Sequence, residues 1–101
     1  MEIDEFVFDE HNISEMARHG VTYIEAIQVI AGEYHVLRNR TRHVASQSLI
    51  IQGRTFGGRV LHIPIQATSD PRIWRPATAY DPSNSQFRRQ EGEFEDDVEP
   101  R

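Results

Sequence analysis

Residues 48–65 read SLIIQGRTFGGRVLHIPI, which is two apolar runs joined by a glycine-containing link. In the second run every other residue from Leu61 to Ile65 is a large aliphatic, the period of a strand with one buried face. The pair Gly57-Gly58 supplies the positive φ angles that a tight turn needs. The sequence therefore predicts a strand, a hairpin connection and a second strand, at residues 48–52, 53–58 and 59–65.

A strand and two helices are predicted ahead of this hairpin. Residues 2–8 mix apolar and acidic side chains, as a short strand does. Apolar residues at helical spacing follow, and Gly20 stands where a left-handed C-terminal cap belongs, so the first helix should span residues 9–19. Thr22 and Glu25 form a capping box that begins a second helix.

The remaining elements give the fold class. Strands are predicted at residues 34–37 and 72–80, and Asp81-Pro82 is typical of the start of a short helix that runs to about residue 90. Pro76 cannot donate to a ladder, so it implies a bulge or an edge position in its strand. We therefore expect an α+β fold: two N-terminal helices packed on an antiparallel four- to five-stranded sheet, with a short C-terminal helix.

Length and charge divide the chain. At 101 residues it has room for one core, so we expect a single domain over residues 1–90 and a disordered tail over residues 91–101, six of which are acidic. Residues 1–37 hold eight acidic residues and one arginine, a net charge of −7. Residues 38–90 hold nine arginines and two aspartates, a net charge of +7. A basic surface is therefore expected within a chain whose overall charge is −5.

Composition excludes several kinds of site. The chain has no cysteine, so it has no disulfide, no thiolate nucleophile and no cysteine-based metal site. Its five histidines lack metal-binding spacing, and we expect neither a metal nor another cofactor. The apolar runs are far shorter than the roughly 20 residues that cross a bilayer. We therefore expect a cytoplasmic protein without a membrane partner.

Three short motifs occur in order along the chain: ARHGVT followed by EA within residues 17–26, GRT with GRVL within residues 53–61, and RPATAY at residues 75–80. Together they resemble the BrnT-type toxins of the RelE/ParE-like superfamily, over roughly residues 6–90. The resemblance implies a RelE/BrnT-like fold and the toxin of a bacterial type II toxin–antitoxin system. The chain departs from the family in its acidic balance and in having only two arginines in segment 81–89.

The resemblance also implies an activity and its partners. Such a toxin is an mRNA interferase, a metal-independent endoribonuclease in which the 2′-OH attacks the adjacent phosphate of mRNA, on the ribosome or away from it. It is neutralised by a cognate antitoxin, and operator DNA is contacted only through that antitoxin. The residues themselves leave an alternative open: a non-catalytic binding module of the same fold that docks a partner protein or a nucleic acid.

Cleavage of RNA without a metal needs a proton acceptor for the 2′-OH, a cation for the phosphorane and a proton donor for the leaving 5′-oxygen. The resemblance implies that Arg54, Arg59 and Arg75 occupy a basic sheet face, with Arg59 or Arg75 as the catalytic cation. His62 and Tyr80 are the candidates for proton transfer, because imidazole and phenol both exchange protons. The alternatives are hairpin arginines in water, an exposed strand histidine, and a tyrosine that packs in the core or an interface.

Five further residues are candidates for RNA binding. Arg42 and His43 lie in an arginine-rich stretch, which is alternatively a solvated loop. Trp74 is suited to stack on an unpaired base, although a single tryptophan in a small domain is also typical of a core. Arg88 and Arg89 supply basic charge in the last predicted helix.

Overall fold

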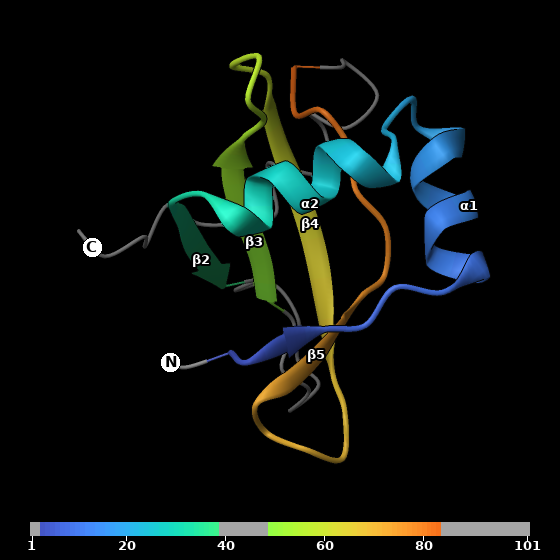
Figure 1. Cartoon of the computed structure of the whole chain (residues 1–101), viewed down its shortest axis with the longest axis vertical. Helices are drawn as coiled ribbons and strands as arrows, with labels where there is room; N and C mark the ends of the chain where they lie inside the picture. Colours follow the sequence, from blue (N-terminus) through green and yellow to red (C-terminus); the bar gives the residue numbers. More distant parts are fainter. Residues whose placement is uncertain (1–2, 39–48, 84–101) are drawn as a thin grey trace.

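The structure is a computed structural model that describes residues 3–38 and 49–83. A helix crosses one face of a five-stranded sheet, and a second helix lies beside the first (Figure 1). The predicted α+β class is thereby confirmed for these residues. In chain order the elements are β1 (Glu5–Phe6), α1 (Glu10–Arg18), α2 (Tyr23–Ala31), β2 (Tyr34–Arg38), β3 (Leu49–Arg54), β4 (Val60–Ala67) and β5 (Ile73–Pro76).

Both predicted helices are confirmed, and their ends follow from local capping. Asp9 caps α1, because its carboxylate accepts the Asn12 N–H at 2.8 Å while the Asn12 side chain accepts the Asp9 N–H at 2.9 Å. Thr22 and Glu25 make the predicted reciprocal pair at the start of α2, at 3.1 and 3.0 Å. Gly20, between the helices, has a φ of +76°, the left-handed region that its capping position requires.

The strand order in the sheet is β1-β5-β4-β3-β2. Strands β2 to β5 pair antiparallel with their neighbours, whereas β1 runs parallel to β5. The prediction of an antiparallel sheet is therefore wrong at one edge. After β1 the chain passes through both helices and three strands before β5 returns beside β1, so a long crossover rather than a hairpin sets the direction of β1 (Figure 1).

A bulge interrupts the strand that contains Pro76. The register of β4 with β5 would place residue 79 opposite His62, but Tyr80 forms that bridge. One extra residue is thus accommodated after Pro76, as its missing donor led us to expect. β5 is not an edge strand, since it lies between β1 and β4. The predicted strand 72–80 is β5 followed by an isolated bridge.

The core lies between α2 and the side of β3 and β4 that faces it. Gly53 permits this close packing, because a Cβ at that position would lie 2.9 Å from Val29 Cγ1. Gly53 and Arg54 belong to β3 and Arg59 precedes β4, so the connection spans residues 55–59 rather than the predicted 53–58. The buried members of the core are Met16, Val21, Ala26, Val29, Ile51, Leu61, Ile63, Ile65, Trp74 and Ala79.

Two predicted segments lie mostly or wholly beyond the described residues. The short C-terminal helix was expected to begin at Asp81, whose carboxylate accepts the Ser83 N–H at 2.8 Å, but its body follows Ser83. The acidic tail, residues 91–101, lies entirely outside them. In the part of the chain that the structure describes, no helix combines the length and the apolar composition that crossing a membrane requires.

Candidate functional site

Arg59 connects three distant parts of the chain. Its Nε donates to Asp81 Oδ2 at 3.0 Å, and a terminal nitrogen donates to both Glu25 carboxylate oxygens and to the Gly20 carbonyl, each at 3.1 Å. The bond from the Thr22 N–H and this guanidinium together lower the pKa of Glu25. The hydrogen bond to Asp81 is the main reason that the pKa of Arg59 is raised. One guanidinium therefore holds α2, the turn before it and the chain after Tyr80.

Arg75 makes a similar link between β5 and the start of α1. It contacts both carboxylate oxygens of Asp9, at 2.9 and 3.1 Å, and donates to Gln66 Oε1 at 3.1 Å. The Asn12 N–H contributes most to lowering the pKa of Asp9, and the Arg75 guanidinium lowers it further. Both arginines expected to stabilise a phosphorane thus make ion pairs that fasten the helices to the sheet.

The structure brings His62 and Tyr80 together. Their backbones exchange hydrogen bonds of 2.8 and 2.9 Å, and their ring centroids lie 5.7 Å apart. His62 faces away from Leu61 and Ile63 as predicted, but it is 3 % exposed, so the interpretation as an exposed strand histidine is wrong. Burial lowers the pKa of His62 to about 4, against a smaller opposite effect of the Asp81 charge. The ring is therefore neutral at pH 7.

Two more side chains extend this pair across the sheet. Gln52 lies opposite His62, with its amide Nε2 2.9 Å from His62 Nε2, and His35 lies opposite Gln52 on β2. The Gln52 side chain and the His62 ring are thus hydrogen-bonded to each other across β3 and β4. We call His35, Gln52, His62 and Tyr80 the polar row. It lies on the sheet face opposite α2.

Sequence reasoning missed Gln52 and His35. The register of the hairpin could have identified Gln52. Residues at equal distances before and after Gly57 pair with each other, so Gln52 pairs with His62 just as Arg54 pairs with Val60. No comparable signal identified His35, because residues 39–48 separate β2 from β3 and their sequence does not fix the register of the two strands.

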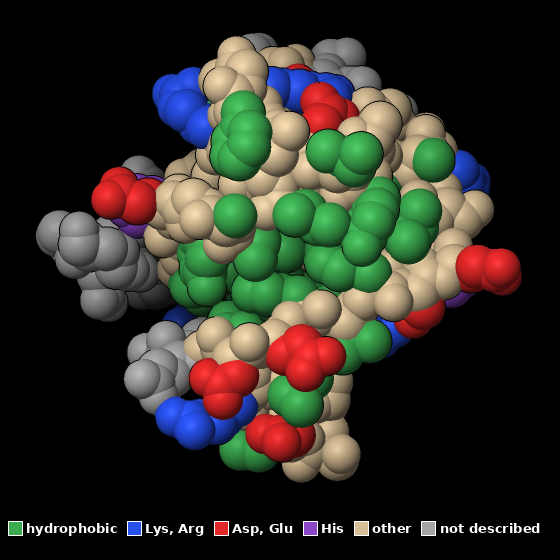
Figure 2. All heavy atoms as spheres, in the orientation of Figure 1, with side chains coloured by type: hydrophobic (Ala, Val, Ile, Leu, Met, Phe, Trp, Pro, Cys, Tyr) green, Lys and Arg blue, Asp and Glu red, His purple; other side chains and the backbone are tan. Residues whose placement is uncertain are grey.

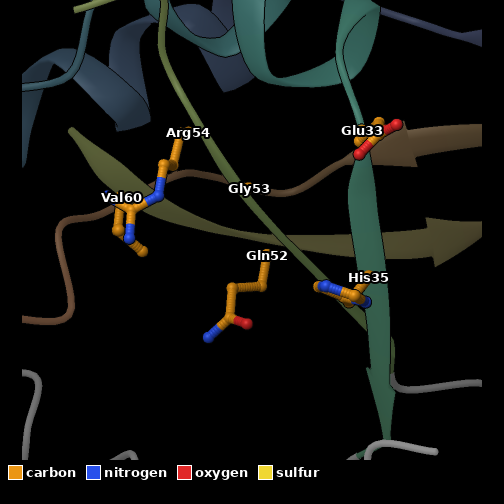
Figure 3. A pocket seen from close by; sticks show the side chains of 6 residues that line it. All are labelled: Glu33, His35, Gln52, Gly53, Arg54 and Val60. Carbon is orange, nitrogen blue, oxygen red and sulfur yellow. The ribbon is translucent and has the colours of Figure 1, made fainter. Parts of the chain in front are cut away.

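A pocket of about 540 Å³ opens at one end of the polar row. Figure 3 shows Gln52 between His35 and the Arg54 side chain, with Glu33 just before the start of β2. Arg54 is exposed and donates to the Gly58 carbonyl at 2.9 Å, and within residues 3–38 and 49–83 the structure gives it no ion pair. The six lining residues are Glu33, His35, Gln52, Gly53, Arg54 and Val60.

Trp74, the one other described candidate for RNA binding, does not line this pocket. Trp74 is 6 % exposed in the core, and its Nε1 donates to the Pro71 carbonyl at 3.2 Å, so the base-stacking interpretation is wrong and the core interpretation holds. Arg42, His43, Arg88 and Arg89 lie outside the described residues. Among those that are described, no three His, Asp or Glu side chains gather as a metal site would require.

The helix side carries an exposed apolar surface. Ile24 is 63 % exposed and Phe56, in the β3–β4 turn, is 78 % exposed, with Tyr23 and Ile27 at its margins. The turn is held to α2 because the Phe56 N–H donates to Gln28 Oε1 at 2.9 Å. Figure 2 shows an apolar area over this side of the molecule, with acidic and basic side chains around it. We call Tyr23, Ile24, Ile27 and Phe56 the α2 apolar surface.

No protein-family model, curated protein or solved structure matches this chain. The resemblance to the BrnT-type toxins therefore rests on the three sequence motifs alone.

Proposed function

We propose that this chain is the toxin of a type II toxin–antitoxin pair, a metal-independent endoribonuclease that acts on mRNA and is neutralised by a cognate antitoxin. The observation that carries the proposal is the Arg59 network. Arg59 belongs to the second motif, Gly20 and Glu25 belong to the first, and Asp81 directly follows the third. The first two motifs thus meet in one contact network, which also includes the residue that follows the third motif.

The RNA surface in this proposal is the sheet face opposite α2. Arg54 supplies the cation there. Arg59 already pairs with the carboxylates of Glu25 and Asp81, and Arg75 pairs with that of Asp9. In the cleavage step the 2′-oxygen attacks phosphorus, the 5′-oxygen leaves, and a 2′,3′-cyclic phosphate forms. His62 accepts the first proton and Tyr80 donates the second.

The antitoxin docks on the α2 apolar surface. Exposed Ile24 and Phe56 give it a large apolar contact area, and surfaces of this kind are typical of protein interaction sites.

A specific observation also favours the alternative, a non-catalytic module that binds RNA. His62 Nε2 already lies 2.9 Å from Gln52 Nε2, so this ring nitrogen is engaged by a neighbouring side chain rather than open to the 2′-OH. Both rings of the proposed proton-transfer pair are at most 4 % exposed. Binding at Arg54 without cleavage needs none of these buried groups to reach the phosphate.

Induced expression in bacterial cells, with total RNA followed over time, separates the two functions. Growth arrest with RNA loss from the parent chain, weakened by Arg54→Gln and retained by the control Arg18→Gln, supports the endoribonuclease. Arg18 suits this purpose because it is exposed on α1 and pairs only weakly with Glu15. Healthy growth with intact RNA, from confirmed soluble protein, contradicts cleavage and supports the binding module.

The antitoxin surface has its own test. We expect Ile24→Glu to prevent co-purification with the cognate antitoxin, while Ser14→Glu, at an exposed position on α1, retains it. Equal co-purification of both variants would contradict the α2 apolar surface as the docking site.

A further inference from the structure

We propose that the pocket over β2, β3 and the start of β4 binds one guanosine nucleotide unit of RNA, with the phosphate at Arg54 and the base at Glu33. This inference rests on the proposed RNA-binding function and assigns the pocket its ligand. The pocket volume, about 540 Å³, lies within the range of small-molecule sites.

The two ends of the pocket have opposite hydrogen-bonding character. Arg54 only donates, and the bond of one terminal nitrogen to the Gly58 carbonyl leaves the rest of the guanidinium fork for a phosphate. Glu33, at the other end, has an exposed carboxylate that accepts hydrogen bonds. The pocket therefore fits a ligand with acceptor oxygens at one end and N–H donors at the other. A nucleotide has this polarity.

The carboxylate selects among the four bases. Guanine presents two adjacent donors on one edge, N1–H and the N2 amino group, and these match the two oxygens of a carboxylate. Uracil offers a single N–H on that edge, while adenine and cytosine each offer one amino group beside an acceptor nitrogen that a carboxylate repels. Guanine is the base that makes two hydrogen bonds with Glu33.

The middle of the pocket fixes the ligand between these ends. The Gln52 side chain is held by its contact with His62, so it forms a preset wall rather than a mobile one. His35 lies opposite Gln52 in the β2–β3 register and faces the same hollow (Figure 3). Its imidazole donates to a phosphate or ribose oxygen at this position.

Titration of the full, isotopically labelled chain with 3′-GMP, 3′-AMP, 3′-CMP, 3′-UMP and inorganic phosphate tests the pocket by NMR. We expect 3′-GMP to shift the backbone amides of His35, Gly53 and Arg54 and to bind at least fivefold tighter than 3′-UMP. Arg54→Gln should weaken both 3′-GMP and phosphate about tenfold. Glu33→Gln should weaken 3′-GMP at least fivefold and leave phosphate unchanged.

Arg18→Gln and Glu15→Gln are the matched controls, because they remove the same charges from an exposed pair on α1. Circular dichroism and a thermal melt confirm that each variant folds. The proposal is overturned if 3′-GMP shifts none of the pocket amides. It is also overturned if all four nucleotides bind with equal affinity. Binding needs no cleavage: 3′-GMP selectivity with intact cellular RNA supports the pocket in a binding module, whereas RNA loss without 3′-GMP binding overturns the pocket alone.

Discussion

Burial of the His62 imidazole lowers its pKa from 6.5 to about 4, so the folded chain keeps this ring neutral where the unfolded chain protonates it. Between these two values the unfolded state binds more protons, and stability therefore rises with pH. We expect the free energy of unfolding to fall by up to ~1.4 kcal/mol per pH unit as the pH drops from 6.5 towards 4. Denaturant unfolding at several pH values measures this slope.

The matched variant for this prediction is His62→Gln, which keeps a polar side chain but does not titrate. Its stability should change much less over the same pH range, whatever its absolute stability. Parallel slopes for the parent and the variant would show that His62 is not the group responsible.

Arg59 stabilises the fold through two carboxylates and a carbonyl, and its removal leaves all three groups without this donor. We expect Arg59→Ala to lower the free energy of unfolding by about 1–2 kcal/mol, because a network of several ion pairs and hydrogen bonds stabilises a fold more than one isolated surface ion pair does. Arg18→Ala, in an exposed pair, should cost no more than about 0.5 kcal/mol. Urea unfolding of both variants checks the difference, and equal losses would contradict a structural role for Arg59.

The sequence predicted what chemistry each side chain could supply, but it did not predict which groups each side chain contacts. Arginine was assigned to phosphate because of its chemistry, yet Arg59 pairs with a carboxylate 34 residues away and Arg75 with one 66 residues away. Local patterns carry no information about such distant partners. Strand alternation predicted on which side of the sheet His62 lies. It did not predict that His62 is buried, because the residues that cover it come from other parts of the chain.

At the scale of elements, Asn12 joins α1 to the sheet. It is fully buried, and its amide donates to the Val7 carbonyl at 3.0 Å and the Pro76 carbonyl at 2.9 Å, while its oxygen completes the capping box with Asp9. Asn12→Ala leaves these groups unsatisfied, and we expect a loss of roughly 2–4 kcal/mol in unfolding free energy. Thermal and urea denaturation measure it.

Ser14→Ala is the control for Asn12, since Ser14 is exposed on the same helix. Its stability should stay within about 0.5 kcal/mol of the parent, because alanine is a strong helix former. A similar small effect for Asn12→Ala would mean that the buried amide contributes little to the docking of α1.

The helices were predictable because their caps are local, as Thr22 and Glu25 illustrate. The β3–β4 hairpin was predictable because its strands are joined by a short turn. The direction of β1 was not, since its two residues pair with β5 almost seventy residues later in the chain. The polar row and its pocket depend on the register of three strands, so no single segment of the sequence revealed them.

At the scale of the whole molecule, the charges of the chain oppose one another. Residues 38–90 carry a net charge of +7 and the tail, residues 91–101, carries −5. Salt screens interactions between such groups, and it also weakens the binding of RNA phosphates to arginine. The tail is therefore expected to compete with RNA for the basic surface at low ionic strength.

Replacing the six tail carboxylates by amides tests this competition without shortening the chain. We expect tighter binding of single-stranded RNA at low salt, by several fold, and convergence with the parent at high salt. Removing charge at the exposed residues Glu5 and Glu10 controls for overall charge. If the tail competes at the Arg54 surface, Arg54→Gln must weaken RNA binding more in the neutralised chain than in the parent. An equal effect in both chains would show that the tail acts through net charge alone.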